Sequence, residues 1–527
     1  MVKIIYNDIA VGAKADFTPS IGDRYAPSNL ALLKQDGAEF PHYATLEQDQ
    51  TILDGSQPIQ PDSGAVIALW SNSLSGANGS FAAAPVLTMS AAGQYTSQGI
   101  TITTDPDVWA NSITIAWYRG GTLLSSADFT PDSAVFFCKS RVDSYNKVVI
   151  TFRSLCLPGR RLKIRSIDFG VIRTFEGGAL ADVSVIQECS PISEEIAINT
   201  LDFTLIGDSE VNYVFQAKQP LKLYNNDALM GVFFVESYDR TADRFYTVKA
   251  EDYKSLLDAA QFRGGMYSGY SASTLIAEIC AAANVPLSLD PALSSAAVTG
   301  WIPITTCREA LEQAAFAVGA AVDTAGSDAV RVFVPSDTAV HHFGLGEIMQ
   351  GQKLVDRDKK LTELRLTVHR YSASTESATL YSGDAGTSIY VEFAEPMHSL
   401  SITNGSIIES GANYAVIAAL SGCELKGMKY LHTETVLTKR NPLTNVGDPV
   451  NAVEIRSQTL AHAGLLDALY AHYIKQGTIE GEMGITGQRP GDTVEIETEY
   501  SGTITAQIES MRYRLYGGAI VAEVSAR

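Results

Sequence analysis

The chain has little positive charge for its length. Its 527 residues include 39 Lys and Arg against 59 Asp and Glu, which gives a formal net charge of −20. A protein that binds nucleic acid neutralises phosphates with lysine and arginine, so this balance argues against specific nucleic-acid binding. An acidic surface instead favours solubility and repels DNA that passes close to it.

Paired cysteines are also missing. The six cysteines are far apart in the sequence and form no C-x-x-C motif; they are Cys138, Cys156, Cys189, Cys280, Cys307 and Cys423. This spacing favours buried free thiols over a disulfide framework or a zinc site. It also predicts folding in the reducing cytoplasm.

Long apolar runs are absent as well. No window approaches the roughly 18 consecutive apolar residues of a membrane-spanning helix. We therefore expect no membrane span. The first residues, MVKIIYNDIAVGAKADF, also show neither the apolar stretch nor the cleavage site of a signal peptide. Hydrophobic residues still make up 46% of the chain, which predicts a folded protein, and the length suits roughly three to five domains.

The motifs of common enzyme classes are not present. There is no P-loop, H-E-x-x-H or G-x-S-x-G pattern, and GLGEIMQG at 344–351 lacks the third glycine of a dinucleotide-binding loop. His341 and His342 would point to opposite faces of a strand, so they suit no shared metal centre. We therefore expect no enzyme activity, no cofactor and no metal centre.

Residues 305–333, TTCREALEQAAFAVGAAVDTAGSDAVRVF, form one complete small folding unit. Thr306 and Glu309 have the spacing of a capping box at the start of a helix. Gly319 suits the left-handed residue that ends a helix, and two short strands follow around a Gly-Ser turn. The unit carries no evident chemistry. Its capping, its alanine-rich face and its hairpin predict a rigid wedge docked on the side of a barrel, where small residues allow close approach.

Most of the chain consists of short, alternating apolar segments separated by turn residues, which predicts a mainly β, multidomain protein. We divide the sequence into six parts. They are an N-terminal arm (1–60), a β-sandwich (61–172), a first β-barrel (173–262), an α/β insert (263–335), a β-rich region (336–455), and a helix with a second β-barrel (456–527).

The order of these parts resembles the baseplate hub (tail hub) proteins of bacteriophage tails. The resemblance covers about residues 173–527 and rests on runs that include SPISEEIAINTLDFTLIGD, GVFFV, YTVKAED, the 305–333 unit, ELRLTVHRY, PGDTVEI and SGTITAQIESMRYRLYGGAIVAEV. The preceding block, with VFFCKSRVDSYNKVVITF and PGRRLKIRSIDFG, is similar to the galactose-binding-like sandwiches of some phage tail proteins.

The resemblance implies a non-enzymatic structural protein with a galactose-binding-like sandwich, two hub β-barrels and an α/β insert. It further implies a homotrimeric ring on the tail axis. This ring would link the tail tube or distal tail protein to a spike or fibre protein, beside the tape-measure protein, in a virion tail assembled in the host cytoplasm. The alternatives are a glycan-binding adsorption protein that acts through the sandwich, and a cell-wall hydrolase whose site has no recognisable pattern.

Candidate glycan contacts lie in the loop-like segment TTDPDVWANS of the sandwich. Trp109 could stack its ring on a sugar, because aromatic rings at binding surfaces commonly pack on apolar sugar faces. Asp105 and Asp107 could add oxygen ligands for a sugar or for Ca²⁺. Trp117 lies in the alternating segment ITIAWY and is expected in the core instead.

A second candidate set is the run VEIETEY, in which Glu495, Glu497 and Glu499 alternate on one strand face. An ordinary solvated face explains such a pattern. In a threefold ring, however, the same face could line a negative lumen that DNA crosses without sticking.

Overall fold

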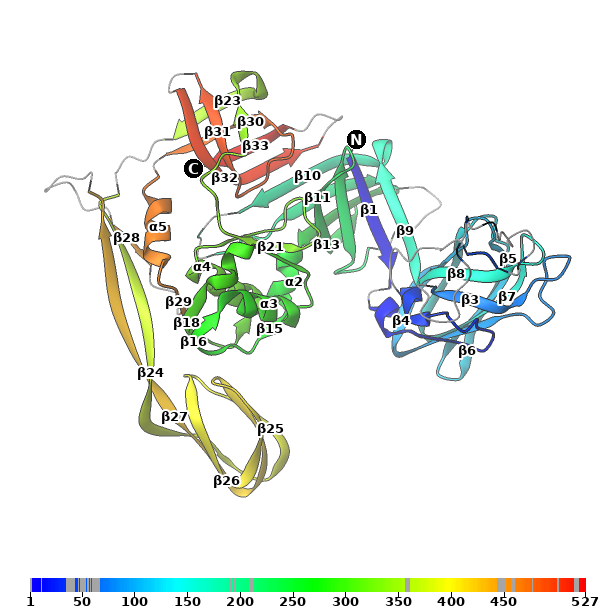
Figure 1. Ribbon diagram of the computed structural model, residues 1–527, viewed down its shortest axis with the longest axis horizontal. Helices are drawn as coiled ribbons and strands as arrows, with labels where there is room; N and C mark the ends of the chain where they lie inside the picture. Colours follow the sequence, from blue (N-terminus) through cyan, green and yellow to red (C-terminus); the bar gives the residue numbers. More distant parts are fainter. Residues whose placement is uncertain are drawn as a thin grey trace. The chain divides into compact units, whose positions relative to one another are not determined.

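The computed structural model describes most of the chain. The described residues are 2–10, 12–34, 43–45, 47, 54, 56, 58, 67–189, 192, 195–207, 213, 215–355, 361–442, 452–455, 460–475, 477–499, 502–515 and 521–527. They fall into two compact units. The first unit comprises Met1–Ile4, Phe175–Tyr213 and Pro220–Arg527, and the second comprises Ile5–Thr174 and Val214–Gln219. Both are built mainly from strands (Figure 1), which confirms the predicted mainly β, multidomain class.

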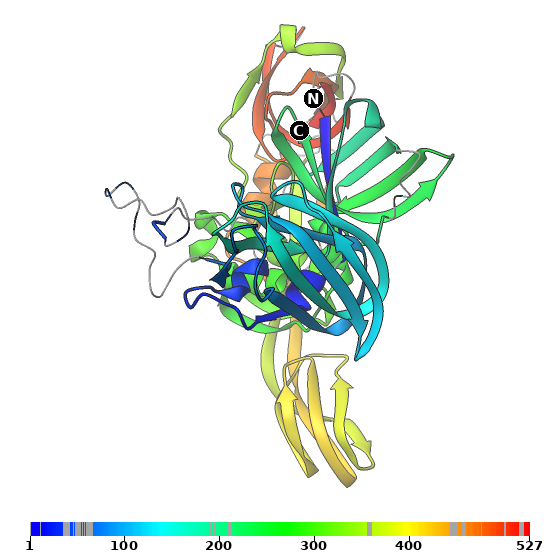
Figure 2. The ribbon, with the colours of Figure 1, turned by 90° about the vertical axis from the view of Figure 1, so that its right-hand side faces the viewer.

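The second unit contains a strongly curved antiparallel sheet, drawn in blue and cyan in Figure 2. Its strand order is β3-β8-β4-β7-β5-β6, with β2 beside β4. The strands are β2 (Thr18–Ile21), β3 (Leu69–Leu74), β4 (Val86–Thr104), β5 (Ala110–Arg119), β6 (Thr122–Phe129), β7 (Val135–Leu155) and β8 (Arg161–Asp168). The pairing of β4 with β7 shifts register three times between Ser90 and Gly99. Such bulges bend and twist a strand, which accounts for the curvature.

The core of the second unit follows the predicted alternation. Ile113, Ile115 and Trp117 on β5 are buried, so Trp117 has the core position expected from its strand. Part of the predicted N-terminal arm packs into the same core. Phe17, just after the short helix α1 (Ala13–Asp16), stacks on Phe169 with ring centroids 4.1 Å apart. The arm also contributes the 3-10 helix Leu30–Lys34.

The largest sheet of the first unit unites strands from two distant parts of the sequence. Its order is β23-β30-β33-β32-β10-β11-β14-β13-β12, and β31 adds to β32. The strands are β10 (Leu180–Glu188), β11 (Thr200–Ile206), β12 (Pro220–Asn225), β13 (Ala228–Arg240), β14 (Phe245–Asp252), β23 (Ile348–Val355), β30 (Thr478–Gly484), β31 (Thr493–Thr498), β32 (Gly502–Arg514) and β33 (Val521–Ala526). The junction is the antiparallel pairing of β10 with β32, from Ser184 opposite Arg514 to Glu188 opposite Ser510. The segments predicted as the first and second barrels therefore share one sheet. Two further strands, β1 (Val2–Ile9) and β9 (Gly170–Glu176), each contain a boundary between the units.

The predicted α/β insert, and the last ten residues of the segment before it, contain short helices and strands (Figure 1). They are α2 (Tyr253–Ala259), β15 (Gln261–Phe262), β16 (Gly265–Ser271), α3 (Ala272–Ala282), β17 (Leu287–Leu289), β18 (Ala297–Ile302), β19 (Thr305–Thr306), α4 (Cys307–Ala317), β20 (Ala321–Asp323) and β21 (Val330–Phe333), with a 3-10 helix at Pro291–Ser295. In the part of the chain that the structure describes, no helix has both the length and the apolar character to cross a membrane.

The helix α4 begins and ends where the sequence predicts. The Thr306 side chain accepts a hydrogen bond from the backbone N of Glu309 at 3.2 Å. The Glu309 carboxylate accepts a hydrogen bond from the hydroxyl of Thr305, where the capping-box pattern predicted the cap amide. After the helix, Gly319 has a φ of +68° as expected, and β20 and β21 form the predicted antiparallel hairpin.

Small residues let α4 approach its neighbours closely. Ala310 and Ala314 are fully buried, in one core cluster with Ile276 and Ile279 of α3. At the other end, a Cβ atom placed on Gly319 would lie 3.1 Å from Cβ of Ala468, on the helix α5 (Leu465–Tyr473). The alanine-rich face of the 305–333 unit thus packs closely, as predicted, but its neighbour in this cluster is the helix α3 and not the side of a barrel.

A buried polar network joins the segment between β20 and β21 to the ends of β11 and β14 and the start of α2. Nζ of Lys254 lies 3.3 Å from Oδ2 of Asp252 and 3.2 Å from Oδ1 of Asn199. The hydroxyl of Thr324, from the insert, donates to Asp252 and accepts from Nδ2 of Asn199 at 3.0 Å. Beside it, Oδ1 of Asp323 accepts from a backbone amide at 2.9 Å. Burial raises the pKa of Asp323 to about 6 and also raises the pKa of Asp252.

The region before α5 forms a long ribbon with a distal β module (yellow in Figure 1). Its strands are β24 (Glu363–Gly383), β25 (Gly386–Glu392), β26 (Met397–Ser410), β27 (Tyr414–Arg440), β28 (Ala452–Ile455) and β29 (Leu460–Ala461). At the base, β28 pairs with residues 363–366 of β24. In the distal module, β25 and β26 pair with residues 414–429 of β27. Between them, residues 367–373 pair with residues 430–436, and we call this two-stranded section the ribbon.

The cysteines are free thiols, as the sequence predicts. Five of the six are buried, and Cys156 is half-buried. Burial raises the pKa of the Cys138 thiol to about 12, so this group stays protonated at neutral pH.

Candidate functional site

The three candidate glycan contacts lie in the loop between β4 and β5. Oδ1 of Asp105 accepts a hydrogen bond from the backbone N of Asp107 at 2.9 Å. Oδ2 of Asp105 lies 3.5 Å from Nζ of Lys163. Trp109 is half-buried and Asp107 is exposed. The structure thus places the three residues in one loop, and the side chain of Asp107 is the most open to a ligand.

Lys163 explains why Asp105 is held inward. Its Nζ lies 3.1 Å from Oε2 of Glu47, which is fully buried, and 4.6 Å from the ring centre of Trp70. Oε1 of Glu47 also accepts a hydrogen bond from the backbone N of Arg161 at 2.8 Å. A buried lysine needs such carboxylates to compensate its charge. Asp105 therefore has a structural task that the sequence pattern did not reveal.

Of the three glutamates of VEIETEY, Glu495 and Glu497 lie on β31 (Thr493–Thr498) and contact their own chain. Oε2 of Glu495 lies 3.2 Å from Nδ1 of His342. Oε2 of Glu497 accepts a hydrogen bond from the backbone N of Leu345 at 3.1 Å. Glu499 follows the end of β31 and is exposed. The lumen role of these carboxylates remains a prediction.

The adjacent histidines point away from each other, as expected for neighbours on a strand. They lie on β22 (His341–Phe343), which pairs in parallel with β31. Nε2 of His341 lies 3.1 Å from Oε1 of Glu347, whereas Nδ1 of His342 contacts Glu495. Each histidine thus has its own carboxylate, and the two rings share no centre.

A cavity of about 790 Å³ lies against β10, β23, β30, β32 and β33. Its charged lining residues are Glu188, Lys353, Glu480, Glu482, Arg512 and Glu523. Nη1 of Arg512 lies 3.9 Å from Oε2 of Glu523. Small-molecule sites are mostly apolar with few polar groups. The mixed-charge lining of this cavity differs from that pattern.

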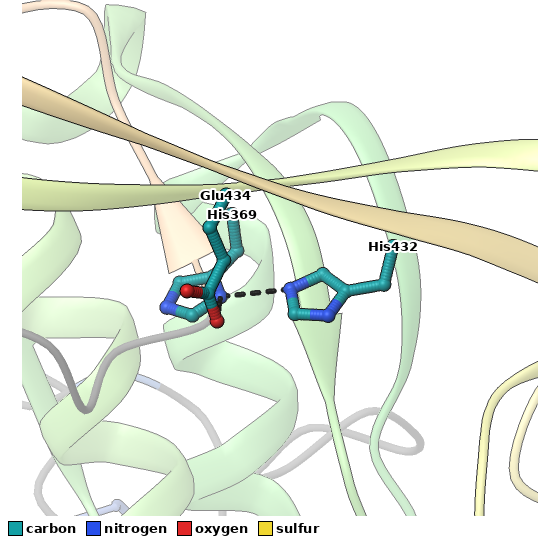
Figure 3. Close-up of side chains that lie close together, drawn as sticks. All are labelled: His369, His432 and Glu434. Carbon is teal, nitrogen blue, oxygen red and sulfur yellow. Dashed lines mark hydrogen bonds and ion pairs between the residues drawn. The ribbon is translucent and has the colours of Figure 1, made fainter.

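The ribbon carries a cluster of metal-ligand side chains, shown in Figure 3. His369 on β24 lies opposite Glu434 on β27, and His432 is two residues from Glu434 on the same strand face. Nδ1 of His369 lies 2.9 Å from Nε2 of His432 and 3.7 Å from Oε1 of Glu434. Within the described residues, this is the group of three whose ligand atoms all lie within 4.8 Å of one another. We call it the ribbon cluster.

Sequence reasoning missed the ribbon cluster because its members are far apart in the chain. His369 lies in the run ELRLTVHRY, and His432 and Glu434 lie in LHTETV. The alternation His-x-Glu in one strand was the available signal. Only the register of β24 with β27 adds the third ligand.

No family model matches the chain, and no curated protein matches it. Solved structures of tail proteins do show similarity to it. A 43 kDa tail protein of prophage MuSo2 from Shewanella oneidensis is 10% identical with a TM-score of 0.42, over 67% of this chain and 95% of that one.

Two further tail proteins show similarity at the same level. A tail protein from Neisseria meningitidis MC58 is 11% identical with a TM-score of 0.40, over 66% of this chain and 96% of its own. The prophage tail protein gp18 from Listeria monocytogenes EGD-e is 10% identical with a TM-score of 0.39, over 66% and 94%. At these values the likeness assigns no family to the chain.

Proposed function

We propose that the chain is a structural component of a phage-type tail and acts there as a baseplate hub. In this role three copies form a ring on the tail axis. The ring links the tail tube or distal tail protein to a spike or fibre protein and lies next to the tape-measure protein. The observation that carries the proposal is the pairing of β10 with β32. The sequence resemblance assigns these strands to two different hub barrels, and their hydrogen bonds make both barrels one continuous platform.

Exposed apolar side chains on the ribbon support an assembly role. Leu431 and Val436 are each 58% exposed. Residues an odd number of positions apart on a strand point to opposite faces, so Leu431 and Val436 expose apolar surface on both sides of the ribbon. Exposed apolar patches on a folded protein commonly mark interaction surfaces.

The buried network supports a non-enzymatic role. A strongly shifted pKa often marks a catalytic group, and Asp323 has one. However, Asp323 and its neighbour Lys254 are both fully buried, so no substrate reaches them. The shift of Asp323 results from packing between the barrel and the insert.

The acidic balance supports a path for DNA and argues against a DNA-binding site. A net charge of −20 repels phosphates. In the proposed ring, Glu495, Glu497 and Glu499 of three copies face the lumen. The free thiols are consistent with folding in the host cytoplasm before incorporation into the virion tail.

The oligomeric state of the purified chain tests the hub proposal. We expect light scattering to report a trimer and negative-stain electron microscopy to show a ring with a central channel. Val436→Asp should weaken this assembly, while Leu123→Asp, at a position of the sandwich that is 53% exposed, should leave it unchanged. A monomer at high concentration, both alone and with a tail-tube protein, would contradict the hub.

A second candidate function is glycan-binding adsorption through the sandwich. The half-buried Trp109 beside the exposed Asp107 is the observation that favours it. A glycan array should then show binding that Trp109→Ala abolishes and Leu123→Ala does not. A cell-wall hydrolase is the third candidate, and release of peptidoglycan fragments by the chain would support it.

A further inference from the structure

We propose that the ribbon cluster, His369, His432 and Glu434, binds one divalent cation of the zinc type. Two imidazoles and one carboxylate are donors that zinc and its neighbours in the first transition row accept. Mg²⁺ and Ca²⁺ prefer oxygen ligands alone, so they fit this donor set poorly. The site does not depend on the hub proposal, because it rests on the register of two strands.

The separations of the ligand atoms match the geometry of such a site. Ligands at about 2.0–2.1 Å from a zinc ion in a tetrahedron lie about 3.3 Å from one another. The distance from Nδ1 of His369 to Nε2 of His432 is 2.9 Å, and that from Nδ1 of His369 to Oε1 of Glu434 is 3.7 Å. A cation between these atoms would replace the direct contact of the two imidazoles. The Glu434 side chain is 58% exposed, so it has room to rotate onto the ion.

Aromatic neighbours hold the histidines in place. The rings of His369 and His432 are nearly parallel, with centroids 5.2 Å apart, and meet edge to edge through their nitrogens. The ring of Tyr371 stacks on His432 at 4.7 Å. Trp301 of β18 packs edge-on against Tyr371, and its indole N–H donates to Oδ1 of Asn413 at 2.6 Å. Side chains held by their neighbours lose less freedom when a cation binds, which favours binding. The fourth position of the cation is left for water or for another donor.

The position of the ribbon cluster suggests what the cation does. One ligand comes from β24 and two come from β27, so a bound ion joins the two strands. In the described strands, residues 367–373 pair only with residues 430–436, and an isolated two-stranded ribbon is marginally stable in water. The cation therefore stiffens the ribbon between the body of the first unit and the distal module.

Zinc binding by the full chain tests this inference directly. The chain is freed of metal with a chelator and dialysed against micromolar ZnCl₂, and the bound zinc is measured by atomic emission. We expect one zinc per chain. Changes to residues that only contact a metal ligand cost roughly 10–100-fold in metal affinity. His432→Ala and His369→Ala each remove a ligand itself, so each should weaken zinc binding by more than that. His398→Ala, a histidine of the distal module, is the matched control and should bind zinc like the wild type.

The alanine variants could lose zinc because they misfold. A conservative variant and a structural measurement separate this from the loss of a ligand. Glu434→Gln keeps the shape of an exposed side chain but removes its charge, and should lower zinc affinity at an unchanged melting temperature of the metal-free chain. Zinc should also slow amide hydrogen exchange at residues 367–373 and 430–436 in the wild type and not in His432→Ala. Absence of binding at micromolar zinc, or binding that His369→Ala, His432→Ala and Glu434→Gln leave unchanged, overturns the proposal.

Discussion

The first unit contains two clusters of ionisable side chains that differ in whether a positive charge of the chain balances their carboxylates and lone pairs. In the buried network, Lys254 lies between Asp252 and Asn199, so both signs of charge are present in one place. In the ribbon cluster, His369, His432 and Glu434 all offer lone pairs, and they lie on a surface that solvent reaches. The first cluster can therefore be satisfied by the chain alone, whereas the second gains most from a cation. The first three predictions below test the buried network and the packing near it. The fourth tests an exposed pair of side chains, His342 and Glu495.

Removal of the buried lysine should have the largest effect. Lys254→Met leaves the carboxylate of Asp252 buried without its cation, and breaking a buried pair in this way costs about 3–5 kcal/mol. We expect a large drop in the unfolding transition of the first unit, measured by urea titration followed by circular dichroism. Lys249→Met, an exposed position on β14, is the control and should change stability by less than about 0.5 kcal/mol. Equal stability of the two variants would show that the network is not required.

The proton on Asp323 should have the next largest effect. Its pKa is about 6 in the folded chain and near 3.8 without the fold, so between these values the folded state binds more protons than the unfolded state. The free energy of unfolding then falls as the pH rises from about 4 to 6, by up to about 3 kcal/mol for this group. In Asp323→Asn this contribution is absent.

The test of the Asp323 prediction is the pH dependence of thermal unfolding. We expect the wild type to lose more stability than Asp323→Asn between about pH 4 and 6, because other titrating groups contribute equally to both chains. Asn keeps an oxygen that can accept the hydrogen bond from the backbone N of Ala325. Parallel curves for the two chains would show that Asp323 is already ionised in the folded state at low pH.

The packing of α4 against α3 should respond more mildly. Ala314→Leu adds bulk to a fully buried position of α4, and overpacking of this kind costs about 1–3 kcal/mol. We expect a lower melting temperature and impaired assembly, with no catalytic step affected. Ala282→Leu makes the same change at an exposed position of α3 and should have little effect. An unchanged melting temperature in Ala314→Leu would mean that α4 can move away from α3.

Local signals made much of the fold predictable. The helix α4, its cap at Thr306 and the hairpin after Gly319 were read from short-range chemistry, because capping and turns depend on a few neighbouring residues. The pairing of β10 with β32 could not be predicted in the same way. It joins residues more than 300 positions apart, and alternation along a strand does not say which strand lies beside it.

The same limit applies to the sites. Asp105 looked like a ligand in its loop, but its contact with Lys163 depends on the pairing of β4 with β8. The ribbon cluster depends in turn on the register of β24 with β27. The sequence shows which side chains carry charge or could bind a metal. Which of them meet depends on strand pairing, and only the folded chain reveals that pairing.

The smallest effect on stability is expected at the exposed pair of His342 and Glu495. Their side chains are 51% and 47% exposed, and surface ion pairs contribute about 0–1 kcal/mol. Glu495→Gln should therefore shift the melting temperature little, in contrast to Lys254→Met. If the lumen role is correct, the combined changes Glu495→Gln, Glu497→Gln and Glu499→Gln should still raise the retention of linear DNA by the assembled ring at low salt, because each charge is repeated in three copies. A gel-shift assay measures this retention. Wild-type behaviour of the triple variant would mean that these carboxylates form an ordinary solvated face, and that these three charges do not affect the retention of DNA.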